Sequence, residues 1–443
     1  MSDEVISLLK KHPWVGDARW SPDRTTIAVR PAASAITVRP IPGPLLAEHL
    51  AHWQHVYEFV YSAARDHHRD DLDLSGWRAS DTGAPFPQEH MLEWIEHAVG
   101  LALRGKPRIV LEIGCGSGLL AHRIQPHVHA YVGLDVAAPV VERLQAQLAP
   151  GAQVLRAAAH ELATPPVRAA LRTADPDHPA PDCIVLNSVT QCFPNREYLA
   201  AVVGDALDLV ATGGTVVVGD IRNLASAPEF ARWLETARNP ALPESDLAAR
   251  VTRRLATDEE LLCAPEVFAH IANSHRRAVR TTVYAKPFRM VTELTRYRYD
   301  IVYTVDAPPP PPGRSLAWAE SVGTVEHRLG TLPDQITRVT GIPNALLPSA
   351  ESDAVTPAQL ATAAPVGWTV QLDSADGSRL AVCAPEHSAE AALSSDNAAD
   401  GCNEPFTRFV RRRLPEVLTD HLARELPAAP APRIVVTEEP DRT

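Results

Sequence analysis

The chain has 443 residues, of which 45% are hydrophobic, and it carries a formal net charge of −12. This length suffices for two or three cores, because single domains rarely exceed about 250–300 residues. The sequence has no basic run that would bind nucleic acid phosphates, and its apolar runs are too short to span a membrane. Six scattered cysteines without paired spacing predict reduced thiols in a cytoplasmic protein, with no disulfide framework and no metal site.

The N-terminal half alternates between helical and strand-like patterns. Residues 1–45 contain a short helical pattern and two strand-like pieces, and residues 46–65 and 87–104 have apolar residues at helical spacing. Between residues 108 and 221, the apolar runs RIVLEIG, AYVGLDV, AQVLRAAA, DCIVLNSV and TVVVGDI are separated by helical segments. Continuous apolar strands between helices predict a parallel sheet that is covered on both faces.

The C-terminal part has a different composition. A helical stretch over 228–275 is followed by two strand-like runs, AVRTTVYAK and YRYDIVYTV. The prolines within 306–313 then predict a stiff linker of roughly 15 Å. Residues 314–443 contain strand-like pieces at 367–373 and 379–383 and one clear helix, EPFTRFVRRRLPEVLTDHLARELP.

The stretch VLEIGCGSGLL at 110–120 predicts a nucleotide site. Gly114, Gly116 and Gly118 follow a strand and open a helix, so bare backbone can approach a ligand there. A dinucleotide fingerprint needs its third glycine three positions after the second, and this chain has Leu119 at that position. A tight turn without a ligand would need only one glycine.

Two carboxylates distinguish among the nucleotides. Glu112 lies inside the strand before the glycine loop, and Asp135 ends the next strand, where a carboxylate can accept hydrogen bonds from both ribose hydroxyls. This arrangement favours S-adenosylmethionine over a nicotinamide dinucleotide. A structural alternative for Glu112 is that it only caps the glycine turn. Two neighbouring residues complete the predicted contact set, Cys115 and Val136.

Six stretches of the chain resemble the N-methyltransferase domains of nonribosomal peptide synthetases. They are LSGWRASDTGAPFPQEHMLEW, VLEIGCGSGLL, VLNSVTQCFP, GGTVVVGDIRNL, DEELLCAPEVF and TELTRYRYDIVY. The glycine loop is common to many methyltransferases, whereas the later stretches are more particular to this family. The resemblance implies an α/β class, with a doubly wound Rossmann-like sheet over 46–305, a helical lid from 46–104 and 228–275, and S-adenosylmethionine as the cofactor.

In the family that the chain resembles, the methyltransferase interrupts the small C-terminal subdomain of an adenylation domain. Residues 1–45 and 314–443 resemble the two halves of that subdomain, so the resemblance implies a small α+β unit built from both chain ends. The large adenylation core is missing, and the closing segment VVTEEPDRT lacks the family's lysine. We therefore expect no adenylation activity.

The resemblance also implies roles for residues near the strand ends. His160 and Glu161 follow the third strand and would contact adenine, unless they are a solvated loop pair. Asn187, Ser188 and Gln191 would face the cofactor and the substrate, with hydrogen bonding of the loop as the structural alternative.

The substrate side of the expected site includes the end of the fifth strand. Arg222, beside Asn223, would hold a substrate carbonyl or carboxylate, or it would pair with Asp220 as a brace. Tyr297 would accept or relay the amine proton, or it would pack in the core. The predicted catalytic residues are thus Asn187, Asp220, Arg222 and Tyr297, and the predicted substrate-binding residues are Trp77, Asp81, Gln191, Arg222 and Asn223.

Asp81 and Cys192 stand where the family usually has tyrosine. We expect Asp81 either to anchor a positively charged group of the substrate or to open the turn DTGAP, since Asp is a common turn residue. Either difference would change which substrates enter the site.

The expected activity is N-methylation of an amino acid or of an aminoacyl or peptidyl amine in natural-product assembly. The alternatives are a free-standing N- or O-methyltransferase of a diffusible small molecule, and a non-catalytic docking module for a carrier or adenylation partner. Methyl transfer from a sulfonium needs no metal, and a mostly apolar pocket with few polar anchors would suit it. The enzyme must align the amine about 3 Å from the methyl carbon, and a base or a water path must take the proton.

Overall fold

The computed structural model describes residues 2–63, 71–308, 313–348, 351–385, 401–427 and 432–437. The strands of its large sheet are β3 Ile109–Ile113, β4 Ala130–Asp135, β5 Ala152–Arg156, β6 Cys183–Asn187, β7 Thr215–Arg222, β8 Val279–Ala285, β9 Arg298–Val305, β10 Arg314–Ala317, β11 Ile336–Ile342, β12 Thr369–Leu372 and β13 Leu380–Cys383. Their order in the sheet is β10-β11-β13-β12-β8-β9-β7-β6-β3-β4-β5.

The half of this sheet from β5 to β7 is parallel, and β9 and β8 continue it in antiparallel pairing. Strands β3, β4 and β6 are buried at every residue, as expected for strands that are covered on both faces. Successive residues alternate between the two faces, so Leu111 packs in one core and Val110 in the other. The predicted doubly wound α/β fold is confirmed.

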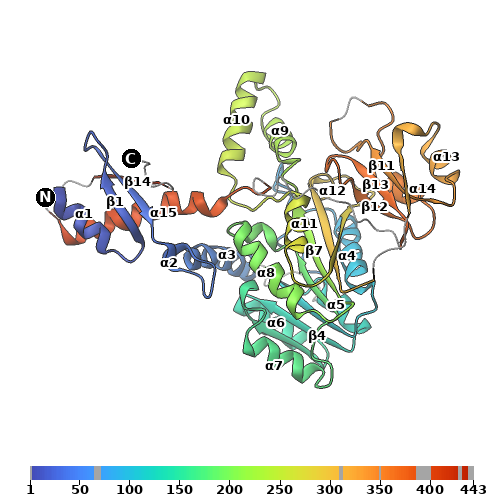
Figure 1. Ribbon diagram of the computed structural model, residues 1–443, viewed down its shortest axis with the longest axis horizontal. Coiled ribbons are helices and arrows are strands. Elements are labelled where there is room, and N and C mark those ends of the chain that lie inside the picture. The colour runs from blue at the N-terminus through green and yellow to red at the C-terminus, as the bar shows by residue number, and fades with distance from the viewer. Residues whose placement is uncertain are drawn as a thin grey trace.

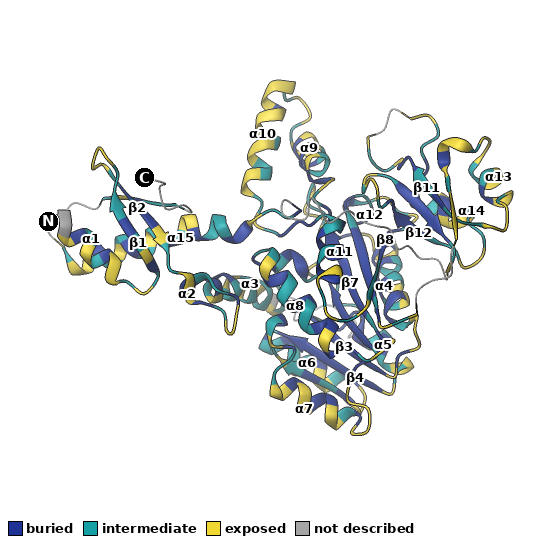
Figure 2. Ribbon diagram, in the orientation of Figure 1, coloured by how far each residue is buried: buried dark blue, intermediate teal, exposed yellow. Residues whose placement is uncertain are grey.

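Helices cover both faces of the sheet and turn their exposed sides to solvent (Figures 1 and 2). Their bounds are α3 Pro44–Ala63, α4 Gln88–Leu103, α5 Ala121–Ile124, α6 Ala138–Gln147, α7 Pro165–Ala174, α8 Arg196–Leu209, α9 Ala227–Arg238, α10 Glu244–Thr257, α11 Pro265–Asn273 and α12 Glu293–Arg296. Within the expected lid segments, α4 and α11 instead bury apolar faces in the two cores, with Ile95 and Phe268 fully covered. The segments that project over the strand ends are α3, α9 and α10.

The two ends of the chain meet in a second, smaller unit (Figure 1). Its elements are α1 Ser2–Lys11, β1 Val15–Trp20, β2 Thr26–Pro31, α2 Ala33–Ile36, α15 Pro405–Glu425 and β14 Arg433–Val436. The last strand, β14, pairs in parallel with β2, which places Ile434 opposite Ile27. Leu414 and Leu418 of α15 are fully buried in its core. Segments from both chain ends thus lie in one small unit.

The expected boundary at residue 314 differs from the structure. Strands β10 to β13, with helices α13 Val325–Gly330 and α14 Pro357–Ala363, extend the large sheet instead of joining the terminal unit. The junction is the antiparallel pair β12–β8, where Gln371 lies opposite Tyr284. This pairing covers the edge of β8, whose backbone would otherwise lack hydrogen-bond partners. Residues 309–312 of the expected linker lie outside the described residues. None of the described helices has the length and apolarity to cross a membrane.

Candidate active site

A cavity of about 670 Å³ lies at the carboxyl ends of β3, β6 and β7. Open α/β sheets bind their ligands at this edge. Its wall includes the glycine loop after β3, Asn187 and Ser188 after β6, and Arg222 at the end of β7. Side chains from α3, α9 and α10 complete the wall, so the cavity lies between the sheet and the projecting helices.

The glycine loop has a backbone that side chains would not fit. Gly114, Gly116 and Gly118 have φ angles of 73°, 50° and 89°, a region that L-residues rarely adopt. A methyl group on Gly114 would lie 2.4 Å from Cγ2 of Val189, and one on Gly116 would lie 2.6 Å from the Tyr61 hydroxyl. The loop therefore forms the bare backbone cradle that the glycine spacing predicts.

Glu112 lies beneath this cradle and contributes to the cavity wall. Its carboxyl is buried, and the Tyr131 hydroxyl donates a hydrogen bond of 2.6 Å to Oε2. Burial raises the pKa of Glu112 to about 8, although the hydrogen bond from Tyr131 acts in the opposite direction. With this pKa the carboxyl is mostly protonated near neutral pH. A cationic group that binds beside it would lower the pKa and favour the ionised form.

Asp135 holds the glycine loop through its carboxylate. Oδ2 accepts the N–H of Gly116 and Oδ1 accepts the N–H of Ala137, both at 2.9 Å. Burial raises the pKa of Asp135, while these two hydrogen bonds lower it. Asp135 and Val136 are not among the residues that line the cavity. The contact of Asp135 with a ribose and that of Val136 with the cofactor stay predictions.

The residues predicted at the adenine side also lie outside the cavity wall. A ring nitrogen of His160 is 2.8 Å from the Tyr198 hydroxyl, and Oε2 of Glu161 accepts the N–H of Ala158 at 2.8 Å. Both side chains thus have partners within the protein, as the structural alternative expects. Their contact with adenine stays a prediction.

The end of β6 presents polar atoms that lack partners. Nδ2 of Asn187 and Oε1 of Gln191 are buried without a hydrogen bond within the described chain, and both residues line the cavity. Nε2 of Gln191 donates to the Ser188 carbonyl at 2.7 Å. A buried polar atom without a partner costs about 1–3 kcal/mol, so these atoms fit a site in which a ligand supplies the partners. The cradle and the two amides together fit S-adenosylmethionine and an amine substrate.

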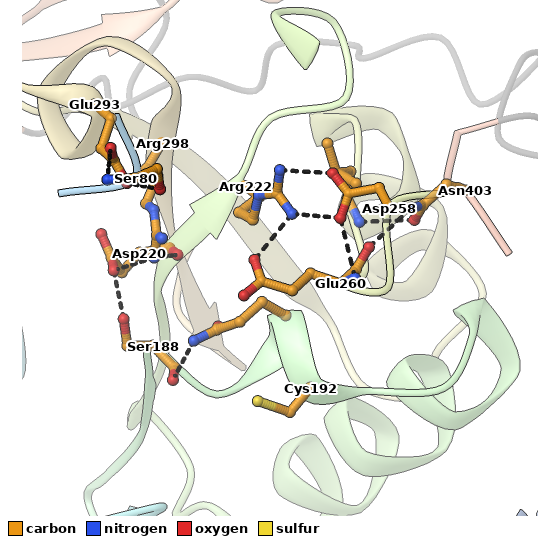
Figure 3. Close-up of polar contacts among 12 residues, drawn as sticks. Ser80, Ser188, Cys192, Asp220, Arg222, Asp258, Glu260, Glu293, Arg298 and Asn403 are labelled. Carbon is orange, nitrogen blue, oxygen red and sulfur yellow. Dashed lines mark hydrogen bonds and ion pairs between the residues drawn. The ribbon is translucent and has the colours of Figure 1, made fainter. Parts of the chain in front are cut away.

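Asp220 is fully buried and does not line the cavity. It has a positive φ of 61°, and its Oδ2 accepts from Nη1 of Arg298 at 2.7 Å and from the Ser188 hydroxyl (Figure 3). Lys286 Nζ lies 3.4 Å from Oδ1. Burial alone would raise the pKa of Asp220, but Arg298 and Lys286 outweigh it and lower the pKa. Asp220 therefore contacts the cavity wall through Ser188 and Arg298, which line it, and a catalytic role for Asp220 stays a prediction.

Arg222 pairs with two carboxylates on the loop that follows α10 (Figure 3). Nη1 and Nη2 each lie 2.8 Å from an oxygen of Asp258, and Nη1 lies 2.9 Å from Glu260. The alternative of a brace between Arg222 and Asp220 is wrong, because Arg298 occupies that place. Arg298, Asp258 and Glu260 were not predicted as site residues, although the stretches DEELLCAPEVF and TELTRYRYDIVY contain them.

Tyr297 and Trp77 both line the cavity. Tyr297 packs edge-on against Phe230 with ring centroids 5.3 Å apart, and burial raises its pKa. Its hydroxyl thus stays protonated near neutral pH, so it could relay a proton only by releasing its own. Trp77 packs on Trp94 with centroids 4.4 Å apart.

The last two predicted residues have local partners. Asn223 lines the cavity, and its Oδ1 accepts the N–H of Ala225 at 3.0 Å. Asp81 does not line the cavity, and its Oδ1 accepts the N–H of Thr82 at 2.8 Å. This geometry favours the turn-forming alternative for Asp81.

The wall is more highly charged than the expected apolar pocket. Its acidic and basic side chains are Asp73, Arg78, Glu112, Arg222, Arg238, Arg254, Asp258, Glu259, Glu260, Glu293 and Arg298. Many of these side chains have partners within the protein. Glu293, for example, accepts hydrogen bonds from the N–H and the hydroxyl of Ser80. In the described ranges, no three His, Cys, Asp or Glu side chains are grouped so that they could hold a metal ion.

Comparison with known families defines the class of this fold and site. Residues 101–245 match the family described as "Methyltransferase domain". This part of the chain is a methyltransferase domain, and the cofactor predicted from the glycine loop, S-adenosylmethionine, is confirmed as that of its class.

Particular relatives are much longer than this chain. Chondramide synthase cmdD of Chondromyces crocatus is 31% identical over 373 residues, which are 78% of this chain and 9% of the relative. A nonribosomal peptide synthetase of Salinispora arenicola, CymA, is 36% identical over 66% of this chain and 4% of its own length. The chain thus spans less than a tenth of either relative. Among solved structures, the N-methyltransferase NodS of Bradyrhizobium japonicum matches with a TM-score of 0.32 and 14% identity, over 50% of this chain and 98% of NodS.

Proposed function

We propose that this protein transfers a methyl group to the amine of an amino acid, or of an aminoacyl or peptidyl thioester on a carrier protein, during nonribosomal-type peptide assembly. The observation that carries the proposal is the cavity in which the glycine cradle meets unpaired amide atoms at the end of β6. The similarity to two peptide synthetases supports the substrate class.

Apart from the methyl donor, the reaction needs only binding and proton-transfer groups, and this chain provides them. S-adenosylmethionine, when bound, supplies a methyl group that its sulfonium already activates. The glycine cradle and Glu112 would hold the methionine end, and Asp135 would hold the ribose. Oε1 of Gln191 would accept a hydrogen bond from the amine and so orient its lone pair. The proton that leaves the amine would pass to water at the cavity mouth, either directly or by a relay in which the Tyr297 hydroxyl gives up its own proton as it takes up the new one.

A carrier protein or another synthetase module is the proposed partner of the terminal unit. The resemblance of this unit to an adenylation subdomain supports this role, and the unit projects away from the methyltransferase sheet (Figure 1). The six cysteines are free thiols, which supports a cytoplasmic location.

Two other functions remain as alternatives. One is a free-standing N- or O-methyltransferase of a diffusible small molecule, and the other is a docking module without catalysis. Incubation with labelled S-adenosylmethionine distinguishes all three. A panel of free amino acids, aminoacyl carrier proteins and simple alcohols and amines is offered, and the labelled product is identified by mass spectrometry. Labelled N-methyl aminoacyl product supports the proposal, and O-methyl product or no turnover would refute it.

A further inference from the structure

The cavity contains two arginines from neighbouring strand ends, and their surroundings differ. Arg222 faces two carboxyl groups, Asp258 and Glu260. Both of its terminal nitrogens are within 2.9 Å of a carboxylate oxygen. Because a guanidinium has a fixed set of donors, little of this side chain is left for a substrate.

Arg298 has a different balance of partners. Only its Nη1 makes hydrogen bonds among the described residues, to Oδ2 of Asp220 at 2.7 Å and to the Asp220 carbonyl at 3.5 Å. Its Nε and Nη2 have no acceptor within the described part of the chain, and neither atom is fully buried. Since Arg298 lines the cavity, these donors are accessible from it.

A buried group of charged side chains holds Arg298 on the side away from the cavity. The fully buried carboxylate of Asp220 contacts it, and Lys286 lies 2.8 Å from Asp300 and 3.4 Å from Asp220. His97 completes this buried group with a contact of 2.8 Å to Asp300. The carboxylates of Asp220 and Asp300 thus face the cations of Lys286 and Arg298, and Arg298 is held rigidly at the cavity end of the group. Rigid donors aimed at an acceptor lose little entropy on binding.

The same cavity wall also contains negatively charged groups, Asp258 and Glu260. In the Arg222 group two carboxyl groups face one guanidinium, which leaves an excess of acidic groups at Asp258 and Glu260 (Figure 3). The cavity thus offers a cationic donor at the start of β9 and acidic groups on the loop that follows α10. A molecule that has an oxygen acceptor beside a protonated amine matches both.

We infer that Arg298 binds the carbonyl oxygen of an α-aminoacyl substrate and thereby selects substrates whose amine stands one carbon from a carbonyl. This inference rests on the proposed function. Holding the carbonyl fixes the position of the neighbouring amine, so Arg298 is a specificity-determining residue, whereas Asp220 and Lys286 are positioning residues that act through it.

The test compares two substrates that differ only at the carbonyl. One is the best aminoacyl N-acetylcysteamine thioester from a panel of amino acids, and the other is its thioether analogue, in which CH₂ replaces C=O. Wild-type protein should prefer the thioester in kcat/KM. Arg298→Lys keeps a cation beside Asp220 but loses the guanidinium donors. It should lower kcat/KM for the thioester by about 10- to 100-fold and for the thioether by less than about threefold, with no change in the Kd of S-adenosylmethionine.

Arg222→Lys is the matched control, because its guanidinium is already paired with protein carboxylates, and it should change both substrates in parallel. Equal losses on both substrates in Arg298→Lys would assign Arg298 a structural role and overturn the inference. If Arg298→Lys does not fold, the wild-type comparison decides, since equal kcat/KM for thioester and thioether also overturns it. Failure of the wild-type protein to methylate any amine would instead refute the proposed function.

Discussion

Glu112 is a carboxyl group that the fold keeps away from water at the base of the cofactor cradle. Its pKa is about 8 in the folded chain and near 4.5 when exposed, so the unfolded chain loses its proton first as pH rises. The folded state is therefore favoured most at low pH, and this contribution is lost between about pH 4.5 and pH 8. Each pH unit in that window costs up to about 1.4 kcal/mol.

Replacing Glu112 with Gln removes this titration. The free energy of unfolding of Glu112→Gln relative to wild type should increase steadily from about pH 5 to pH 8. Urea unfolding across this range, followed by tryptophan fluorescence, measures the difference. Glu142→Gln, at an exposed position of α6, should give no such slope. Parallel curves for wild type and Glu112→Gln would show that Glu112 is already ionised in the folded chain.

Asp135 tests the proposed ribose contact. In Asp135→Asn one acceptor oxygen becomes a donor, so the variant cannot serve both the loop amides and a ribose. We expect the Kd of S-adenosylmethionine to rise by about 10- to 100-fold, the usual cost of losing a hydrogen bond to a charged group. Isothermal titration calorimetry measures it.

Asp175→Asn is the control for Asp135→Asn, because Asp175 also accepts a charged hydrogen bond, from Arg108 at 2.6 Å, but has its partner just before β3 and not in the glycine loop. It should bind the cofactor as wild type does. Wild-type affinity in Asp135→Asn would leave Asp135 with its loop contacts alone.

At the scale of elements, the close approach of β6 and β7 fixes the position of Asn187. A methyl group on Gly219 of β7 would lie 2.0 Å from Oδ1 of Asn187. Gly219→Ala should therefore push the Asn187 side chain from its place, destabilise the protein by about 1–3 kcal/mol and lower kcat at least about tenfold. Thermal unfolding and the labelled-methyl assay measure the two effects.

Gly204→Ala in α8 is the matched change without a clash, because no atom lies within 4 Å of the added methyl group. It should stabilise the helix by up to about 1 kcal/mol and leave kcat unchanged. Full activity in Gly219→Ala would mean that the position of Asn187 does not matter for catalysis.

The inner parallel strands could be predicted from sequence because they are short runs rich in Val, Ile and Leu, as in IVLEI and CIVLN. Strand β10 could not, since RSLA is mostly exposed and shows no alternation. The ion pairs at the site could not be predicted from the sequence either. Arg222 and Asp258 are 36 positions apart, and Arg298 and Asp220 are 78 apart, so only the folded sheet brings them together. Family resemblance marked the stretches but not the pairing.

At the scale of the whole molecule, the chain forms all described strands of the large sheet before its last described strand pairs with the N-terminal strand β2. Strands β10 to β13 extend the sheet at β8, and among the described residues that follow them α15 contacts α1 and β14 pairs with β2. The helix α15 contacts both α1 and α3, so it connects the terminal unit to the projecting helix beside the cavity. The composition of the C-terminal part does not reveal this division, because both portions contain short strands.

The terminal unit should then unfold independently of the sheet when its own core is weakened. Leu418 of α15 is fully buried, and Leu418→Ala should cost about 2–5 kcal/mol. Hydrogen exchange should show faster exchange in β1, β2 and β14, while β3, β4 and β6 keep their protection. Methylation of free small substrates should persist.

Asp420→Ala, an exposed change on the same helix, separates loss of core packing from an effect on the helix itself, because alanine favours helix at either position. It should leave exchange in β1 and β2 unchanged. Equal acceleration of exchange in the terminal unit and in β3, β4 and β6 would mean that the two units unfold as one. In that case the chain ends would stabilise the methyltransferase sheet, and their removal would abolish methylation of every substrate, including free amines.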